Sequence, residues 1–125
     1  MDSFCSKIVD YFRDNDCEET IIALTLRDIF LNDLIYISYT NKWQQYDLKK
    51  KQWEHFEIEK LVQNISKVSH FYENDFTNHL ENSNLQDIEK FYIKKQLKSI
   101  VSYANEKFKR DLFIEKCQDC FRIAS

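Results

Sequence analysis

The sequence predicts a mainly helical α+β fold: a bundle of about five helices with a small antiparallel hairpin of two or three strands near residues 34–56. Three observations support this prediction. The chain contains no glycine and no proline, the residues that form the tight turns and rigid corners of many-stranded folds. Apolar residues make up 43% and charged residues 31% of the 125 residues, which is typical of a globular protein. Finally, apolar side chains recur at helical spacing everywhere except around the predicted hairpin.

The length suits one compact unit, so we expect residues 1–125 to form a single domain. Two helices are expected before the hairpin. The first covers about residues 3–14, where four apolar side chains follow helical spacing: Phe4, Ile8, Tyr11 and Phe12. The second covers about residues 17–31. Its predicted start is a capping box, in which Asp16 accepts hydrogen bonds from first-turn amides and Glu19 reaches back.

The segment LIYISYT, residues 34–40, departs from helical spacing, because five of its seven residues are β-branched or aromatic. We expect a strand there, a turn at Asn41 and Lys42, a returning strand in KWQQYDL, a turn at residues 47–51 and a brief third strand in QWEHFE. So few strands cannot bury their faces alone, and the sheet should pack against helices. Three aromatic residues are its predicted anchors: Trp43, Tyr46 and Trp53.

The first helix after the hairpin is expected over residues 58–81. Its apolar stripe steps by three and four along the chain: Ile58, Leu61, Val62, Ile65, Ser69, Tyr72, Phe76 and Leu80. A second helix should span residues 85–109, with a cap from Ser83 and Gln86 or from Asn84 and Asp87. Its predicted inner face is Leu85, Ile88, Tyr92, Leu97, Ile100, Val101, Ala104 and Phe108.

A last helix is expected over residues 111–123, with Asp111 as its cap. Its apolar residues are Phe113, Ile114, Cys117 and Phe121. Neither an internal repeat nor a low-complexity linker separates these elements.

Charge is distributed unevenly along the chain, whose net charge is −3. Residues 1–40 hold 3 basic and 8 acidic residues, whereas residues 90–125 hold 9 basic and 4 acidic residues. Lys90, Lys94 and Lys98 repeat a positive charge at each turn of one predicted helix, and such a row either contacts phosphates or is an ordinary solvated face. The same alternatives apply to the lysines at the expected hairpin tip: Lys49, Lys50 and Lys51.

The aromatic residues of the hairpin also permit two interpretations. Exposed on strands, they would form a platform on which bases stack, as in proteins that bind single strands, and Trp43 is the residue of choice for that role. Buried, Trp43, Tyr46 and Trp53 would anchor the sheet to the helices, which we favour because the small sheet has few other large side chains.

Catalytic and metal-binding patterns are missing from the sequence. A phosphate-cradling loop needs glycine, which the chain lacks. Cys117 and Cys120 form an isolated C-x-x-C pair without the second pair of a zinc site, and the three histidines show no metal spacing. We therefore expect four free thiols, no metal, no cofactor, no small-molecule ligand and no catalysis by this chain alone. With neither a signal peptide nor a membrane-spanning run, a soluble intracellular protein is expected.

Residues 18–75 resemble the segment before the ATPase module in poxvirus-type primase-helicases and related superfamily 3 replicative helicases of viruses and phages. The similarity rests on an order of motifs: the extended run Ile35 to Tyr39, then Lys42-Trp43, Tyr46-Asp47, Trp53, and the helical stretch Leu61 to Ser66. The ATPase motifs of that family lie after this region and do not occur here. The resemblance implies a helper that holds DNA or joins subunits beside a helicase motor.

Two functional hypotheses follow. In the first, the chain is a non-catalytic accessory module of a viral or phage helicase or primase. It would contact single-stranded or forked DNA through Lys49, Lys50, Lys51, Lys90, Lys94, Lys98 and Trp43. In the second, it is a helical protein–protein interaction module without nucleic-acid binding, whose partner is an ATPase module or a copy of itself. Its 19 aromatic residues favour this hypothesis, since a small core cannot hold all of them.

Overall fold

The computed structural model describes residues 2–30 and 33–122. Within these ranges it contains seven α-helical segments, two π-helical segments (η1 and η2) and one three-stranded sheet. This confirms the predicted α+β class. The elements are α1 (Asp2–Asp14), α2 (Glu18–Phe30), β1 (Leu34–Ile37), β2 (Lys42–Asp47), β3 (Gln52–His55), α3 (Glu59–Gln63), α4 (Ile65–Phe71), η1 (Tyr72–Phe76), α5 (Thr77–Glu81), α6 (Asp87–Ser102), η2 (Tyr103–Lys107) and α7 (Arg110–Phe121).

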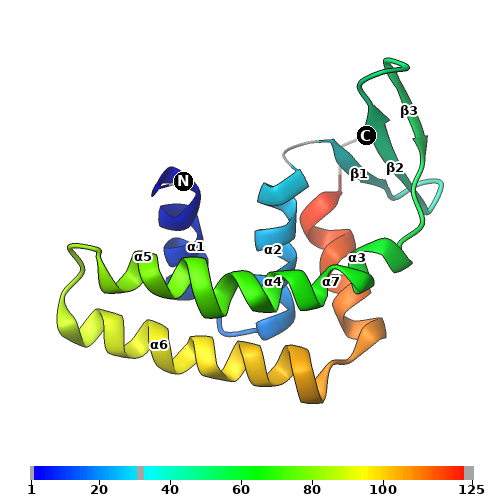
Figure 1. Cartoon of the computed structure of the whole chain (residues 1–125). Helices are drawn as coiled ribbons and strands as arrows, with labels where there is room; N and C mark the ends of the chain where they lie inside the picture. Colours follow the sequence, from blue (N-terminus) through cyan, green and yellow to red (C-terminus); the bar gives the residue numbers. More distant parts are fainter. Residues whose placement is uncertain (1, 31–32, 123–125) are drawn as a thin grey trace.

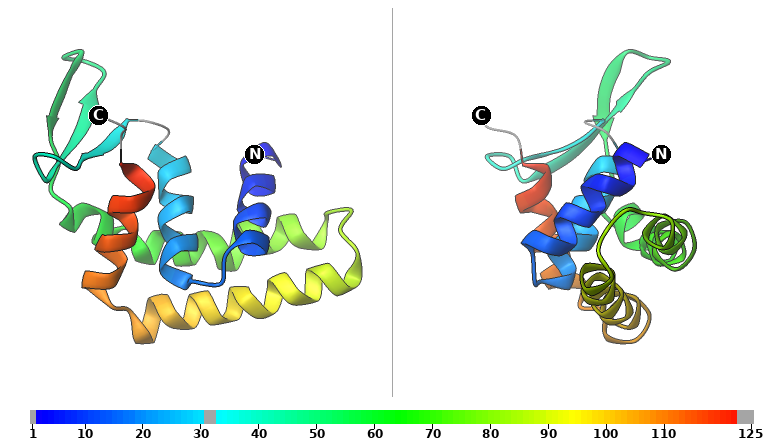
Figure 2. Two further views of the ribbon diagram at one scale, coloured as in Figure 1. Left: turned by 180° about the vertical axis from the view of Figure 1, so that it is seen from behind. Right: turned by 90° about the vertical axis from the view of Figure 1, so that its left-hand side faces the viewer.

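The helices form two crossed groups (Figure 1). Segments α4, η1 and α5 follow one another as one long rod, which α3 precedes at an angle, and α6 with η2 returns beside that rod in the opposite direction. Helices α1, α2 and α7 stand across this pair, and the sheet lies at the far ends of α2 and α7 (Figures 1 and 2). Among the described helices, none has the length and apolar character needed to cross a bilayer.

The core lies where the two groups cross. The Phe12 ring of α1 stacks on Phe76 at a centroid distance of 5.3 Å and meets Tyr72 edge-on at 5.8 Å. Tyr72, Phe76 and Leu80 are all fully buried, as the predicted stripe requires. On the other side, Phe113, Cys117 and Phe121 of α7 are buried, and α7 packs along α2.

The predicted continuous helix over residues 58–81 is interrupted twice. Asn64 separates α3 from α4, with φ −81° and ψ −3°, and its side-chain amide donates to the Lys60 carbonyl at 2.8 Å. Further on, residues 72–76 wind as a π-helix, where the Thr77 hydroxyl donates to the Tyr72 carbonyl five residues earlier at 2.8 Å. A π turn widens the helix by one residue, and such insertions are not visible in apolar spacing alone.

The predicted helix caps are wrong. Helix α6 begins after Gln86 without a side-chain cap, and Ser83 instead donates to the Leu80 carbonyl at 2.8 Å. Helix α7 begins at Arg110, so Asp111 lies in its first turn and is not the cap. At the start of α2, the Glu19 carboxylate contacts the Cys17 thiol at 3.5 Å, and Asp16 makes no side-chain hydrogen bond among the described residues. The predicted end points 31 and 123 lie outside those residues.

The predicted inner face of α6 is partly wrong. Leu97 and Ile100 are buried as expected, together with Ile93, but Ile88 and Tyr92 point outward. Burial of Ile93, Leu97 and Ile100 accounts for this orientation, because these three side chains lie on one line of the helix. Ion pairs lie on both edges of the buried face: Glu89 pairs with Arg13 of α1, and Lys94 pairs with Glu81 of α5. Both pairs are partly exposed, so they add little to the burial of the apolar line.

Candidate nucleic-acid interface

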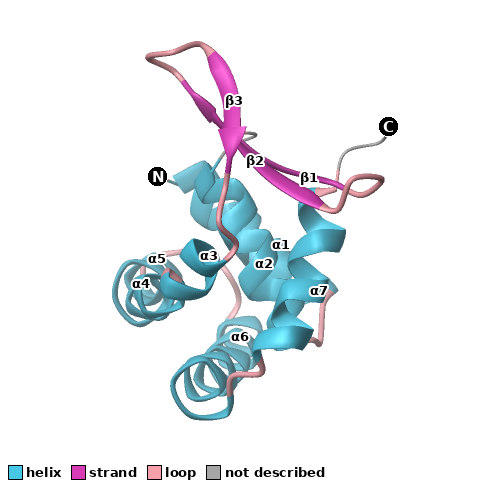
Figure 3. Cartoon of the chain, turned by 90° about the vertical axis from the view of Figure 1, so that its right-hand side faces the viewer, coloured by secondary structure: helices cyan, strands magenta, loops and turns pink. Residues whose placement is uncertain are grey.

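Strands β2 and β3 form a hairpin that projects away from the helices (Figure 3). The sheet order is β1-β2-β3, and both pairings are antiparallel, with Tyr36 opposite Trp43 and Tyr46 opposite Trp53. The predicted turn at Asn41 and Lys42 is wrong in detail, because Ile37 pairs with Lys42 and the turn occupies residues 38–41. Asn41 does take the left-handed conformation expected of it, with φ 55°.

The hairpin tip carries three adjacent exposed lysines, Lys49, Lys50 and Lys51. Asp47 shapes this turn, because its Oδ1 atom accepts the backbone amides of Lys49 at 2.9 Å and Lys50 at 3.1 Å. This is the local bonding by which aspartate stabilises a turn. Lys51 completes it in the left-handed conformation, with φ 54°. Without glycine, the chain therefore holds three ammonium groups together on an ordered turn.

The charges of the tip are partly balanced. Lys50 Nζ lies 3.0 Å from Glu54 Oε1 of β3, and this hydrogen bond and ion pair raise the pKa of Lys50 and lower the pKa of Glu54. Lys49 and Lys51 make no side-chain ion pair with any described residue. Beside the tip, a shallow hollow of about 440 Å³ is lined by Tyr46, Asp47 and Lys49 together with Lys60 and His55.

Trp43 lies under the sheet and is only 6% exposed. Its ring is held between Tyr36, at a centroid distance of 5.2 Å, and Phe121 of α7, at 5.5 Å. The hypothesis that Trp43 stacks on bases is therefore wrong, because neither face of the ring is free for a ligand. Trp43 is instead the anchor that joins the sheet to α7.

Trp53 is not such an anchor, contrary to the prediction. Its side chain is 42% exposed, and its ring meets Tyr46 of the neighbouring strand at 5.3 Å and 67°. Strand geometry explains the difference. Side chains alternate between the two faces of a strand, so Tyr46, three residues after Trp43, lies on the opposite face, together with its cross-strand partner Trp53. The outer face of the hairpin therefore presents a half-exposed aromatic pair.

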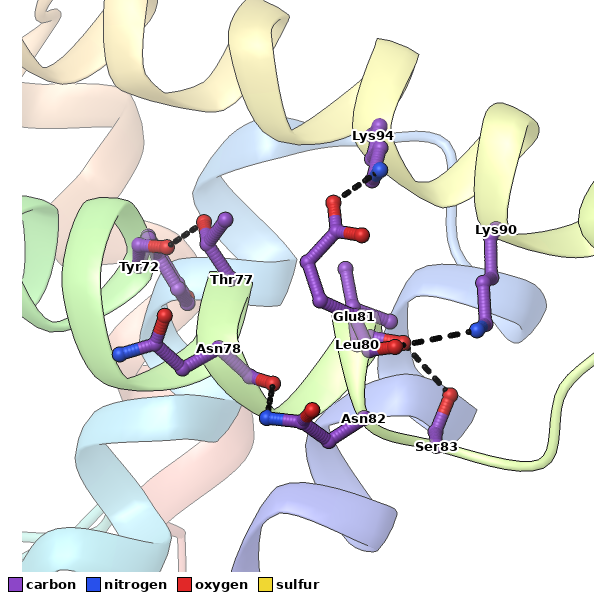
Figure 4. Close-up of polar contacts among 9 residues, drawn as sticks. All are labelled: Tyr72, Thr77, Asn78, Leu80, Glu81, Asn82, Ser83, Lys90 and Lys94. Carbon is purple, nitrogen blue, oxygen red and sulfur yellow. Dashed lines mark hydrogen bonds and ion pairs between the residues drawn. The ribbon is translucent and has the colours of Figure 1, made fainter.

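The lysines of α6 are largely engaged within the chain (Figure 4). Lys94 forms an ion pair with Glu81, which lowers the pKa of that carboxyl, and Lys90 Nζ donates to the Glu81 carbonyl at 3.3 Å. Lys98 makes no ion pair among the residues described. A groove of about 510 Å³ follows Lys94 and Lys98, but Glu73, Glu81 and Glu106 also line it. The row is thus a mixed-charge groove and not a uniform track for phosphates.

The two lysine groups do not meet. The tip lysines occupy the end of the hairpin, whereas α6 lies at the opposite side of the molecule, below the helical rod in Figure 1, and Figure 2 shows the same separation from two further directions. A single short nucleic-acid segment therefore cannot use both groups on one copy of the chain.

The four cysteines form no disulfide with one another. Burial raises the pKa of the Cys117 and Cys120 thiols, which disfavours the reactive thiolate. A hollow of about 750 Å³ between α1 and α5 has Asp10, Arg13 and His79 among its lining residues. Across the described ranges, no group of three or more histidine, cysteine or acidic side chains is arranged to hold a metal ion.

One surface feature was not predicted. Ile88, Phe91 and Tyr92 are exposed side by side on α6, opposite its buried residues. The signal is present in the sequence, since residues 88, 91 and 92 form one helical stripe and residues 93, 97 and 100 form another. The predicted inner face combined Ile88 and Tyr92 of the first stripe with Leu97 and Ile100 of the second, and it omitted Phe91 and Ile93.

Comparison of the chain with protein-family models, with curated proteins and with solved structures finds no match.

Proposed function

We propose that the chain is a non-catalytic accessory module that contacts DNA through the β2–β3 hairpin. The observation that carries this proposal is the projecting tip, on which Asp47 orders three consecutive exposed lysines. Ammonium groups on an extended ribbon can approach the phosphate backbone without interference from the rest of the molecule, and phosphate neutralisation supplies most non-specific affinity. The resemblance of residues 18–75 suggests a replicative helicase or primase of a virus or phage as the setting.

The outer face of the hairpin supports the same proposal. Trp53 and Tyr46 lie beside the lysines, and Trp53 keeps 42% of its surface free. An aromatic face next to cationic groups is the combination with which proteins bind single strands, because bases stack while the lysines follow the backbone. The residue proposed to stack on bases is therefore Trp53 and not Trp43, which the sequence suggested.

Fluorescence anisotropy with labelled single-stranded and duplex DNA tests the proposal. Binding should weaken steeply between about 50 and about 200 mM salt, because each neutralised phosphate releases counterions. Replacing Lys49, Lys50 and Lys51 by glutamine should reduce the slope of log affinity against log salt by about two to three. Trp53→Ala should weaken binding to single strands more than to duplex, since only unpaired bases offer a free face.

A matched control removes the same charge elsewhere. Lys67, Lys107 and Lys109 are exposed, lie away from the hairpin, and have no side-chain ion pair among the described residues. Replacing these three by glutamine should leave both affinity and salt slope near the wild-type values. An equal loss of DNA affinity in the two triple variants would show that only net charge matters, and this would overturn the role of the tip. The absence of DNA binding by the wild type at low salt would also overturn it.

The second candidate is a protein–protein interaction module without nucleic-acid binding. The observation that favours it is the exposed apolar group on α6, Ile88, Phe91 and Tyr92. The anisotropy experiment separates the two candidates, because an interaction module would show no salt-dependent DNA signal.

A further inference from the structure

The outward side of α6 is an amphipathic surface that no described residue of the chain covers. We call it the outer α6 face, and it consists of Asp87, Ile88, Phe91, Tyr92, Lys95, Lys98 and Ser99, all of which are exposed. Its apolar centre is large, since Ile88, Phe91 and Tyr92 are 66%, 64% and 62% exposed. The rings of Phe91 and Tyr92 meet edge-on at 6.3 Å. Among the described residues, the other exposed large apolar side chains are distributed over α2, α7, β3 and the two turns of the sheet.

Two of the three charged residues on this face, Asp87 and Lys98, are arranged in a self-complementary way, and Lys95 adds a positive charge between them. Asp87 and Lys98 are eleven residues apart, which is close to three full helical turns, so they lie along the same edge of the face about 16 Å from each other. Neither makes an ion pair or hydrogen bond through its side chain with the described residues. The negative charge is at the beginning of α6, the positive charge is near its end, and the aromatic centre lies between them.

We propose that the outer α6 face binds a second copy of itself, with the two α6 helices antiparallel about a twofold axis that passes between residues 92 and 93. Such an axis leaves both charged edges on the same side of the interface, so Asp87 of each copy faces Lys98 of the other. Phe91 and Tyr92 then pack against the same residues of the second copy. This proposal is independent of the DNA contact, because it uses a surface remote from the hairpin.

Charge and dipoles both favour this orientation over a parallel one. A parallel pair would place Asp87 opposite Asp87 and Lys98 opposite Lys98, and like charges across an interface are unfavourable. Antiparallel helices also bring each positive helix N-terminus beside a negative C-terminus. In an isologous twofold interface the same surface of both copies is in contact, so that surface must be complementary to itself. The pairing of Asp87 with Lys98 meets this requirement.

The available area indicates a weak, reversible dimer. At the exposed fractions given above, the three apolar side chains offer on the order of 400 Å² per copy. Two copies would thus bury about half of the roughly 1,600 Å² of a standard interface. Association should therefore depend on concentration in the micromolar range and above, where weak interfaces are populated.

Sedimentation velocity between about 10 µM and about 1 mM tests the proposal, because a micromolar equilibrium shifts from monomer to dimer across this range. Ile88→Glu should abolish the dimer. Leu48→Glu is the matched control, since Leu48 is an apolar residue of similar exposure, 74% against 66%, but lies at the hairpin turn, and it should leave the dimer intact. A monomer at every concentration, or a dimer unaffected by Ile88→Glu, would overturn the proposal.

Charge reversal tests the orientation. Asp87→Lys and Lys98→Asp should each weaken self-association about tenfold, because each reversal creates two repulsive pairs across the twofold axis. An equimolar mixture of the two variants should associate about as tightly as the wild type, since every pair between unlike chains is then attractive. Restoration in the mixture is the expected result, and two variants that stay monomeric when mixed would contradict the antiparallel pairing.

Zero-length carbodiimide coupling supplies an independent readout. The two groups are about 16 Å apart within one chain, too far for direct coupling, so an Asp87–Lys98 link must join two copies. In a mixture of isotope-labelled and unlabelled chains, mass spectrometry should find this linked peptide with one half of each kind. Dimers that lack this link and join other carboxylate–lysine pairs instead would overturn the proposed interface.

Discussion

The Trp43 ring of β2 meets the Phe121 ring of α7 at a centroid distance of 5.5 Å and an interplanar angle of 64°. Through this contact a strand near the middle of the chain is joined to the last described helix. A backbone bridge between Tyr36 and Arg122 reinforces the same junction. Helix α7 therefore helps to position the hairpin, together with Phe30 at the end of α2, whose ring meets Phe56 after β3 at 6.1 Å.

The two tryptophans should differ sharply in their contribution to stability. Trp43→Ala removes a buried ring between two aromatic neighbours and should lower the free energy of unfolding by about 3–5 kcal/mol. Trp53→Ala removes a half-exposed ring and should cost about 1 kcal/mol or less. Urea denaturation followed by circular dichroism measures both values. Trp43→Phe should recover part of the loss, and equal costs for Trp43→Ala and Trp53→Ala would contradict the anchor role of Trp43.

The buried hydroxyl pair of Thr25 and Tyr72 should show coupled energetics. Thr25 Oγ1 donates to the Ile21 carbonyl at 2.9 Å and lies 2.6 Å from the Tyr72 hydroxyl, so the Tyr72 O–H donates to Thr25. Thr25→Val leaves the fully buried phenol without its acceptor and should cost about 1–3 kcal/mol. Tyr72→Phe removes the donor while Thr25 keeps its backbone bond, so it should cost about 1 kcal/mol.

A double-mutant cycle on these two residues measures the coupling. The double variant, Thr25→Val with Tyr72→Phe, should cost less than the sum of the single variants, because it leaves no buried donor unpaired. Urea denaturation of the four proteins gives the required free energies. Strict additivity would contradict the hydrogen bond.

Alkaline pH should destabilise the fold through Tyr72. Burial raises the pKa of Tyr72 above its ordinary value of 10.0, because the charged phenolate would lose its hydration in the core. Above about pH 10 the unfolded chain releases this proton while the folded chain keeps it, so the folded state binds more protons and stability falls as pH rises. Below about pH 10 Tyr72 keeps its proton in both states, so this group does not lower the free energy of unfolding.

The measurement is the urea midpoint between about pH 8 and about pH 11, on either side of the ordinary tyrosine pKa. For one tyrosine the free energy of unfolding should fall by up to about 1.4 kcal/mol per pH unit above the unfolded pKa. Tyr72→Phe should show a correspondingly smaller decline. Identical pH dependence in the two proteins would refute the assignment.

A glycine at position 51 should stabilise the protein. Lys51 takes the left-handed conformation, with φ 54°, which is costly for a residue with a β-carbon. Lys51→Gly should therefore raise the free energy of unfolding by about 0.5–1 kcal/mol, after allowance for the greater entropy of glycine in the unfolded chain. Thermal unfolding measures this gain.

Asn41→Gly is the informative comparison for that variant. Asn41 also has a positive φ, of 55°, but its Oδ1 atom accepts a hydrogen bond from the Tyr36 hydroxyl at 2.5 Å. Asn41→Gly should relieve less strain than Lys51→Gly, because asparagine tolerates left-handed geometry better than lysine does. The Asn41→Gly variant also loses the hydrogen bond from the Tyr36 hydroxyl. A gain at position 41 that equals the gain at position 51 would show that this bond contributes nothing.

The sequence by itself determined the approximate place of the helical regions and of the sheet, but not the break at Asn64 or the π-helical segments η1 and η2. Apolar spacing predicted the helices, the β-branched run LIYISYT predicted where the sheet begins, and the stripe through Tyr72, Phe76 and Leu80 correctly predicted core residues. These features are local, since each depends on the periodicity of one segment and on the conformational preferences of its residues.

Only the tertiary structure decided which face of an element is buried when both faces are apolar. Helix α6 carries two apolar stripes, and its packing against α1, α2 and α5 buries Ile93 and leaves Tyr92 exposed. Trp43 and Trp53 are the same residue type on one hairpin, yet α7 covers the first and leaves the second exposed. Such choices depend on contacts between segments far apart in the chain, which no local pattern encodes.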